Sequence, residues 1–321
     1  EHAEAAMIFG SGMAAISSTM LTFLKSGDHA VIQNDIYGGT RSFIESHFKN
    51  YGIDYSFTKD LSSEAFEDCI QENTKLIYIE TPSNPLLKLV DLFAIAKLAK
   101  SHRIVTAADN TFASPIVQNP LDLGVDIVMH SATKYFGGHS DISAGAVASS
   151  QEIMDKIWNL SKDFGGNLSD YTVWLLERSM KTLGIRVKAQ QRNAKRLAKF
   201  LNKHTAVKSV YYPGLKTNEY HGLAKIQMKG FGAMMSFELT EEYNAEAFLK
   251  ALELIKPSMS LAGVESTMLL PCKTSHALLS DSDRLSQGIT DQLIRFSVGI
   301  ENKSDLINDI EQAISASHSK R

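Results

Sequence analysis

The sequence predicts an α/β protein with a large, mostly parallel sheet, followed by a smaller α+β domain. Short runs rich in β-branched residues alternate with longer amphipathic stretches in the first half of the chain, which is typical of strand–helix–strand units. These runs show little polar alternation, as expected for strands covered on both faces. The 321 residues exceed what one hydrophobic core usually supports, so we expect two domains.

Five strands and two amphipathic helices are expected in the first half of the chain. The strands begin at His29, Lys75, Arg103, Val125 and Ala144, and the helices cover residues 40–49 and 92–102. Residues 4–9 (EAAMIF), before the first glycine-rich turn, are a poor strand candidate because they carry few of the residue types that favour strands.

The character of the sequence changes near Asp170. Residues 171–201 contain one Gly and no Pro, which predicts one long helix, or two with a break near Gly184. Strands around residues 232–239 and 292–300, and helices at 244–254 and from Ser304, complete the expected second domain. Residues 275–286 are expected to form a loop. We therefore place the large domain at 1–185 and the C-terminal domain at 186–321.

Composition and charge favour a cytoplasmic protein that binds a small molecule. The formal net charge is 33 − 36 = −3, and without a basic surplus we expect no nucleic-acid partner. The two cysteines, Cys69 and Cys272, are far apart, which argues against a disulfide framework or a zinc site and fits a reducing compartment. No apolar run approaches the ~18 residues of a membrane helix, and no signal peptide is visible. Because the chain begins with Glu1 rather than Met, an N-terminal segment is expected to be absent from it.

The strongest local signal is the stretch at residues 130–139, which follows the strand from Val125. Open α/β sheets place their active sites at the carboxyl ends of the strands. Lys134 in this stretch, desolvated beside other cations, would lose its proton more easily and attack a carbonyl carbon. Ser131 and Thr133, on an extended backbone, could donate hydroxyl hydrogens to a phosphate. A solvated lysine followed by a glycine turn is the alternative.

Three further segments could form parts of the same site. Asp109 ends the strand from Arg103 and could pair with a protonated pyridine nitrogen, or cap a helix N-terminus. The glycine-rich turn at 10–15 could bind an anion, although its match to a GxGxxA pattern leaves a dinucleotide fold open. Tyr37 could stack on a flat cofactor ring and act as an acid or base, or could be an ordinary surface turn residue.

Two polar residues could bind a substrate carboxylate. Asn84 lies in a loop held by two prolines, and Arg295 lies within an apolar strand. Arg295 needs a partner there, and either a bidentate carboxylate ligand or a structural salt bridge would suffice. By contrast, Met234 and Met235 are expected to fill the core. The histidines at 130, 139 and 276 lack metal-ligand spacing, so no metal site is expected.

In their type and order, these residues resemble the Cys/Met-metabolism family of pyridoxal-phosphate enzymes. The stretches SATKYFGGHSD and YIETPSNP are similar to that family's signature sequences, and the resemblance extends from Ser11 to about Ile310. It implies an aspartate-aminotransferase-like fold (fold type I) and the cofactor pyridoxal 5'-phosphate. The implied activity is a carbon–sulfur lyase for sulfur amino acids of the cystathionine or methionine type, acting by β- or γ-elimination. The alternative is a γ-replacement transferase of the transsulfuration group, either cystathionine γ-synthase or O-acyl-homoserine sulfhydrylase.

The resemblance also implies roles for individual residues. Lys134 would carry the cofactor covalently and move protons, Tyr37 would stack on its ring and serve as acid or base, and Asp109 would pair with its pyridine nitrogen. The phosphate would be held by Gly12, Met13, Ser131 and Thr133. The substrate carboxylate would be held by Asn84, Ser260 and Arg295. A homotetramer built from two close dimers with shared active sites is expected on the same basis.

The chain departs from the family pattern at three places. The family usually has an N-terminal Tyr-x-Arg that reaches the phosphate of a neighbouring subunit, and this chain begins after that point. Met259 stands where many cystathionine γ-synthases and γ-lyases have Glu, and Gly39 stands where methionine γ-lyase usually has Cys. The substrate therefore stays open. The competing hypotheses are a nucleotide-binding oxidoreductase that uses the turn at 10–15 and a truncated relative without enzymatic activity.

Overall fold

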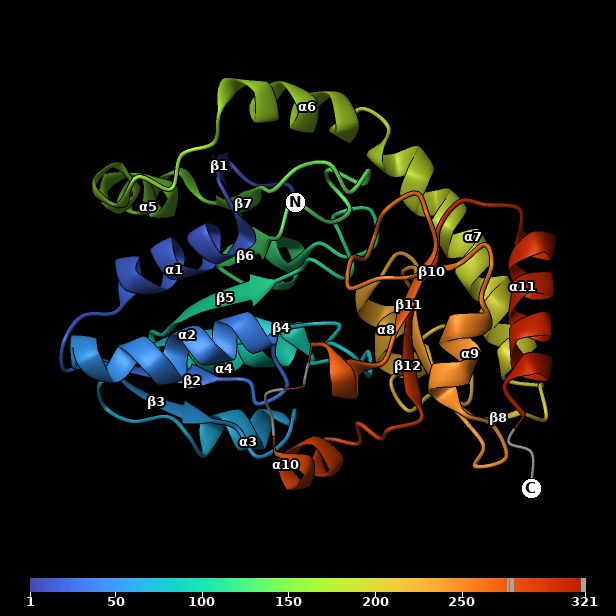
Figure 1. The fold of residues 1–321 in the computed structure, drawn as a ribbon. Coiled ribbons are helices and arrows are strands. Elements are labelled where there is room, and N and C mark those ends of the chain that lie inside the picture. The colour runs from blue at the N-terminus through green and yellow to red at the C-terminus, as the bar shows by residue number, and fades with distance from the viewer. Residues whose placement is uncertain (276, 278–279, 319–321) are drawn as a thin grey trace.

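The protein contains two sheets, joined and covered by helices (Figure 1). This computed structural model describes residues 1–275, 277 and 280–318, so His276 of the metal-site prediction lies outside the described residues. Three short 3-10 helices are also present in the described part, at Phe48–Tyr51, Pro120–Leu123 and Pro271–Lys273. No helix in the described part is both long and apolar enough to cross a membrane.

The large sheet confirms the expected α/β architecture. Its strand order is β1 (Ala5–Phe9), β7 (Gly145–Ser149), β6 (Ile127–His130), β5 (Val105–Asp109), β4 (Thr74–Glu80), β2 (His29–Ile32) and β3 (Asp54–Phe57). The strands from β6 to β3 pair in parallel, whereas β7 pairs antiparallel with both β6 and β1. The parallel strands therefore end at one edge of the sheet.

Helices cover both faces of this sheet, which explains the near-continuous apolar character of its strands. One face packs against α1 (Gly12–Phe23), α2 (Gly38–His47) and α5 (Gln151–Phe164). The other packs against α3 (Ser63–Glu67) and α4 (Leu92–His102). Along β4, Tyr78 faces the first layer and Ile77 and Ile79 face the second. The expected helix at 92–102 has the same bounds in the structure.

Two expectations for local structure are wrong. Residues 5–9 form the strand β1, which lies at an edge of the sheet and has alternating half-buried and exposed residues. Pairing with β7, which is distant in the sequence, holds these residues in the extended form although two of them are alanines. The expected loop at 275–286 contains the short helix α10 (Asp281–Ser286), which has too few apolar residues to show a helical period.

The helical segment after Asp170 is divided into two helices. α6 (Asp170–Met180) begins after the capping Ser169, whose side chain accepts from the Thr172 N–H, and α7 (Leu183–Leu201) begins after Thr182. The break therefore precedes Gly184, which lies inside α7. In Figure 1, α6 lies apart from the large sheet and α7 runs down beside the second one.

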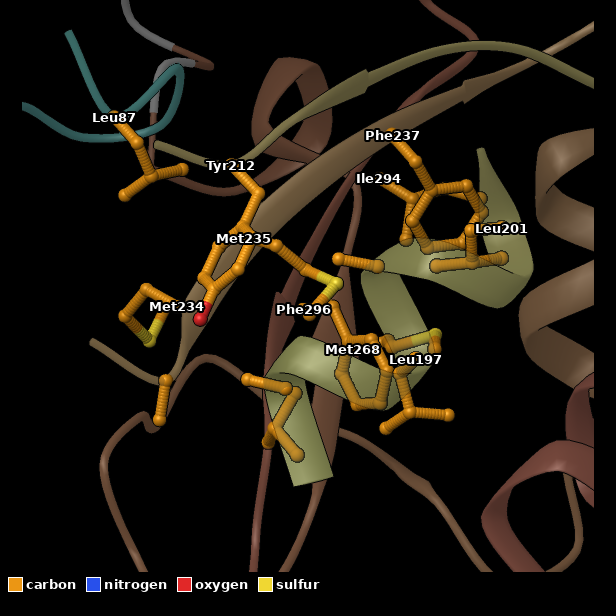
Figure 2. Packing of buried hydrophobic residues seen from close by; sticks show 14 of the residues in the cluster. Leu87, Leu197, Leu201, Tyr212, Met234, Met235, Phe237, Met268, Ile294 and Phe296 are labelled. Carbon is orange, nitrogen blue, oxygen red and sulfur yellow. The ribbon is translucent and has the colours of Figure 1, made fainter. Parts of the chain in front are cut away.

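The second sheet forms the core of the C-terminal part. Its order is β10 (Lys256–Pro257), β11 (Thr267–Leu269), β12 (Leu293–Ser297), β9 (Met234–Leu239) and β8 (Val207–Tyr211), with α8 (His221–Gln227), α9 (Ala245–Ala251) and α11 (Lys303–Ala316) beside it. Met234 and Met235 are buried in this core, as expected, and Figure 2 shows Met235 packed beside Phe296 and the α7 leucines. The same cluster includes Leu87 and Tyr135 from the first half of the chain. The division at 185/186 stays a prediction.

Arg186 joins α7 to the loop that carries Lys134. Its guanidinium donates to the carbonyl oxygens of Tyr135 (2.8 Å), Phe136 (3.2 Å) and Ser179 (2.9 Å), and the side chain is buried. A buried carbonyl that loses its donor costs about 1–3 kcal/mol.

We expect Arg186→Ala to lower the free energy of unfolding by about 3 kcal/mol, because it leaves these carbonyls without a donor. Urea unfolding followed by circular dichroism measures this change. Arg192→Ala, at an exposed position of the same helix, should stay within about 0.5 kcal/mol of the parent. Equal stability of the two variants would contradict the assigned role of Arg186.

Candidate active site

A cavity of about 790 Å³ lies at the carboxyl edge of the large sheet and is closed by residues of the second sheet and its loops. Every site residue expected from the sequence lines it: Gly12, Met13, Tyr37, Asn84, Asp109, Ser131, Thr133, Lys134, Ser260 and Arg295. Glu80, Thr111 and Phe112 also line the cavity and were not expected. The volume suits a small organic ligand.

Lys134 lies in a series of turns directly after β6. The expected extended backbone is wrong here, because Gly137 N–H donates to the Ala132 carbonyl (2.8 Å) and Gly138 N–H to the Lys134 carbonyl (2.7 Å). The chain must turn at this point to return as the antiparallel strand β7. Burial and then the nearby Arg295 guanidinium lower the pKa of Lys134. A larger fraction of this amine is therefore unprotonated at a given pH, as a nucleophile or base requires.

The Thr133 hydroxyl has a structural partner in this loop. It donates to the Ala144 carbonyl (3.2 Å) and accepts from the Ala144 N–H (3.0 Å), which joins the lysine loop to the segment before β7. Its hydrogen is thus already engaged within the chain. Ser131 differs, because its backbone N–H donates to the Thr111 hydroxyl (2.8 Å) and its side chain lines the cavity.

Asp109 is a buried carboxylate at the end of β5. It accepts a hydrogen bond from Thr111 N–H at 2.9 Å, and turns rather than a helix follow it, so the helix-cap alternative is wrong. Burial raises the pKa of Asp109, while the Thr111 hydrogen bonds and the charge of His130 oppose this rise. A cationic group beside it would favour the anion further.

The N-terminus of α1 lies directly against Ser131. A Cβ added at Gly12 would come within 2.9 Å of the Ser131 Cβ, so only glycine allows this approach. The unpaired N–H groups at a helix start attract anions, and with the Ser131 hydroxyl they fit a phosphate. Because β1 is an antiparallel edge strand, this turn is not part of the parallel βαβ unit that a dinucleotide fold requires.

Tyr37 precedes α2 at the rim of the cavity, and its side chain is partly exposed. A Cβ added at Gly39 would lie 2.4 Å from the Tyr37 ring. Glycine at this position therefore leaves room for the ring as it is placed here.

Arg295 is buried in β12 and reaches the loop that carries Asn84. It donates to the Asn84 side-chain oxygen (3.3 Å) and to the Met259 carbonyl (3.0 Å), so in the described part of the chain its hydrogen bonds do not go to a carboxylate. Burial lowers the pKa of Arg295 to about 10. Its charge is thus incompletely compensated and is available to an anionic ligand.

These features fit pyridoxal phosphate. An anion site at a helix N-terminus, an amine with a lowered pKa and a buried carboxylate match the phosphate, aldehyde and ring nitrogen of that cofactor in chemical type. The fold and the site together are those of an α/β enzyme that uses a carbonyl cofactor.

Comparison with known proteins gives the same result. The family model described as "Cys/Met metabolism PLP-dependent enzyme" matches residues 1–315, and the chain belongs to this family. A cystathionine gamma-lyase from Bacillus subtilis is 46% identical over 315 residues (98% of this chain, 83% of the relative). A cystathionine beta-lyase from Lactococcus lactis subsp. cremoris is 43% identical over 307 residues (95% and 80%). An L-methionine gamma-lyase from Fusobacterium nucleatum is 42% identical over 318 residues (98% and 80%).

A solved structure has the same fold. The crystal structure of cystathionine gamma-lyase from Lactobacillus plantarum, complexed with L-serine, superposes with a TM-score of 0.95 at 43% identity, covering 98% of this chain and 83% of the other. The expected family, the fold type I class, the pyridoxal-phosphate cofactor and the carbon–sulfur lyase class are confirmed.

The low pKa of Lys134 can be tested in cofactor-free protein. Arg295→Gln removes a neighbouring positive charge, so the pKa of Lys134 should rise and its reaction with a small amine-directed reagent at pH 8 should slow. Mass spectrometry of the labelled peptide measures the rate. The exposed Lys100 serves as an internal reference, and Arg192→Gln is the matched control. Unchanged labelling of Lys134 in Arg295→Gln would contradict the assigned effect of Arg295.

Proposed function

We propose that this chain breaks the carbon–sulfur bond of cystathionine or methionine-type amino acids in the described cavity, by β- or γ-elimination. The observation that carries the proposal is the presence of Lys134, Asp109 and Arg295 in one cavity, with the pKa of Lys134 lowered by burial and by the Arg295 charge. When bound, pyridoxal phosphate supplies an electron sink for the electrons released at Cα.

Each residue then has a defined task. Arg295 and the Asn84 amide, which are already hydrogen-bonded to each other, bind the substrate carboxylate, with Ser260 beside them. Lys134, once unprotonated, accepts the proton from Cα. The anion of Asp109 would pair with the ring nitrogen, and Tyr37 would cover the ring face and donate a proton to the sulfur as it leaves.

The start of α1 would hold the phosphate. The N–H groups of Gly12 and Met13 point out of a helix N-terminus, and the Ser131 hydroxyl lies against it. Thr133 contributes a hydrogen bond only if its hydroxyl exchanges its partner Ala144 for the phosphate. Its contribution is therefore smaller than that of Ser131.

The side chain of Met259 at the rim of the cavity narrows the choice of substrate. This side chain is 66% exposed and lines the cavity, so the loop before Ser260 offers a thioether where a carboxylate would receive a distal ammonium group. The curated relatives include both cystathionine lyases and a methionine gamma-lyase. Both substrate types are therefore retained, and an uncharged distal group fits this part of the rim better.

The homotetramer expected from the family resemblance requires self-association, and exposed aromatic side chains support that part of the proposal. Tyr171 and Trp174 of α6 stack at 6.1 Å and are 66% and 56% exposed, and Trp158 of α5 is 56% exposed. α6 buries only Leu176 and Ser179 within its own chain. Exposed aromatic clusters of this kind mark protein–protein interfaces, and a second copy of the chain is the partner.

Both cysteines are free thiols, which supports the proposed cytoplasmic location.

Lys134→Ala should reduce the turnover of the cofactor-loaded enzyme by about 1,000-fold or more, because it removes the group that moves the proton. The assay scores keto acid and thiol from cystathionine, methionine and cysteine, with Lys100→Ala as the control. Keto acid from one substrate identifies the bond that is broken. Product only from an activated homoserine together with a thiol would contradict the lyase proposal and support a γ-replacement transferase.

Trp174→Glu should weaken self-association at least tenfold, because a central interface aromatic contributes about 2 kcal/mol or more. Light scattering coupled to size-exclusion chromatography over a dilution series measures this effect. Phe93→Glu, at a 65% exposed aromatic position on α4, is the matched control. A parent protein that is monomeric at all concentrations would contradict the proposed assembly.

A further inference from the structure

Glu80 is a buried carboxyl group at the carboxyl end of β4, and none of the roles above uses it. Its side chain lines the cavity and the residue is 5% exposed. A buried carboxyl group is costly unless hydrogen bonds compensate its lost hydration. The partners of Glu80 therefore indicate what the group contributes.

Both partners are backbone groups of segments that face the cavity. The Tyr37 N–H donates to Glu80 Oε2 at 2.7 Å, and the Asn84 backbone N–H lies near enough to the same carboxyl group to lower its pKa. Tyr37 directly precedes α2, whereas Asn84 lies in the loop after β4, so one side chain lies between two separate walls of the cavity. In the described part of the chain, these hydrogen bonds come from backbone groups rather than from a cationic side chain.

The main chain of Glu80 is fixed independently by Gln33. Glu80 N–H donates to the Gln33 side-chain oxygen (2.9 Å), and the Gln33 amide nitrogen donates to the carbonyl oxygens of Glu80 (2.9 Å) and Asp35 (2.9 Å). The end of β4 is thereby held against the turn that leads to Tyr37. Because this main chain is fixed, the carboxyl group of Glu80 is held at a set distance from the N–H groups of Tyr37 and Asn84.

The surroundings of Glu80 favour its neutral form. Burial raises the pKa of Glu80 well above its ordinary value, and the charges of Asp109 and Asp35 act in the same direction, while the hydrogen bonds from Tyr37 and Asn84 oppose it. Asp109 is the residue opposite Glu80 on the adjacent strand. A neutral carboxyl group accepts hydrogen bonds through its carbonyl oxygen and adds no second negative charge beside Asp109.

We propose that Glu80 is a positioning residue of the active site, whose carboxyl group fixes the backbones of Tyr37 and Asn84 so that both side chains face one part of the cavity. This inference rests on the roles proposed above for Tyr37 and Asn84. It predicts that the hydrogen-bond acceptor at position 80, rather than its charge, is what the reaction needs.

The test compares Glu80→Ala, Glu80→Gln and Glu80→Asp in the full-length, cofactor-loaded enzyme. Loss of a buried acceptor should lower kcat about tenfold through Tyr37 and raise KM about tenfold through Asn84 in the Ala variant. Gln keeps an acceptor of the same length and should restore both constants to within about threefold. Asp is one methylene shorter, cannot reach both N–H groups, and should resemble Ala. The absorbance and circular dichroism bands of the cofactor should change in Ala and Asp but not in Gln, since they report the environment of its ring.

A matched control separates positioning from general stability. Glu238 of β9 is also 5% exposed and is hydrogen-bonded by Ser209 at 3.1 Å, but it does not line the cavity. Glu238→Ala should lower thermal stability and leave the cofactor bands and KM of the folded enzyme unchanged. If Glu80→Ala does not fold, the comparison of Gln with Asp decides the question.

Two results would overturn the proposal. One is a Gln variant that is as impaired as Ala or Asp. The other is a Glu80→Ala effect on kcat that is equally large in a Tyr37→Ala background, because residues that act through one another are not additive. Normal kinetics of Glu80→Ala beside an impaired Tyr37→Ala contradict the Glu80 proposal alone. Normal kinetics of Tyr37→Ala and Asn84→Ala contradict the roles of those side chains, and the Glu80 proposal with them.

Discussion

The structure depends on the burial of charged groups at the carboxyl edge of the large sheet. Burial lowers the pKa of Lys134 and of Arg295 and raises the pKa of Asp109, so the cavity disfavours the ionised form of all three. A ligand that brings a carboxylate and a protonated ring nitrogen supplies the opposite charge to Arg295 and Asp109, and an aldehyde suits the neutral amine that burial favours at Lys134. Because such a ligand compensates charges that the chain leaves incompletely satisfied, its binding also stabilises the folded state.

This burial requires both parts of the chain. Arg295 and Asn84 are separated by 211 residues and meet through a hydrogen bond that joins β12 to the loop after β4. Arg186 of α7 holds the carbonyl groups next to Lys134 in the same way. The hydrophobic cluster of the second sheet also includes Leu87 and Tyr135 of the first half. The C-terminal sheet is thus a wall of the active site as well as a separate layer.

The sequence predicts those parts of the fold in which local pattern and tertiary position agree. Asp109 and Lys134 could be placed in the site because Asp109 ends one apolar strand and Lys134 follows another, and strand ends meet at one edge of a parallel sheet. β1 could not be predicted, because its alanines favour strands only weakly and its extended form depends on pairing with β7, which is distant in the sequence. The turns after Ser131 could not be predicted either, because they follow from the antiparallel return to β7 and from the bond between Thr133 and Ala144. The contact of Glu80 with the cavity could not be predicted, because the sequence shows it only as the last residue of a strand. Its hydrogen-bond partner Tyr37 is 43 residues away.

The two acids at neighbouring strand ends differ in the charge state that their surroundings favour. Glu80 and Asp109 are directly opposite in register, and two buried carboxylates at this spacing do not both ionise readily. The charge of His130 and two hydrogen bonds with Thr111 favour the anion of Asp109. For Glu80, backbone donors favour the anion, but the negative charges of Asp109 and Asp35 disfavour it. The anion therefore belongs on Asp109 and the proton on Glu80. A cationic ring bound beside Asp109 strengthens this asymmetry, since a more fully ionised Asp109 raises the pKa of Glu80 further. In the proposed roles, Asp109 at one strand end would be the counter-charge of the ring, and Glu80 at the neighbouring strand end would be a neutral hydrogen-bond acceptor for the segments around it.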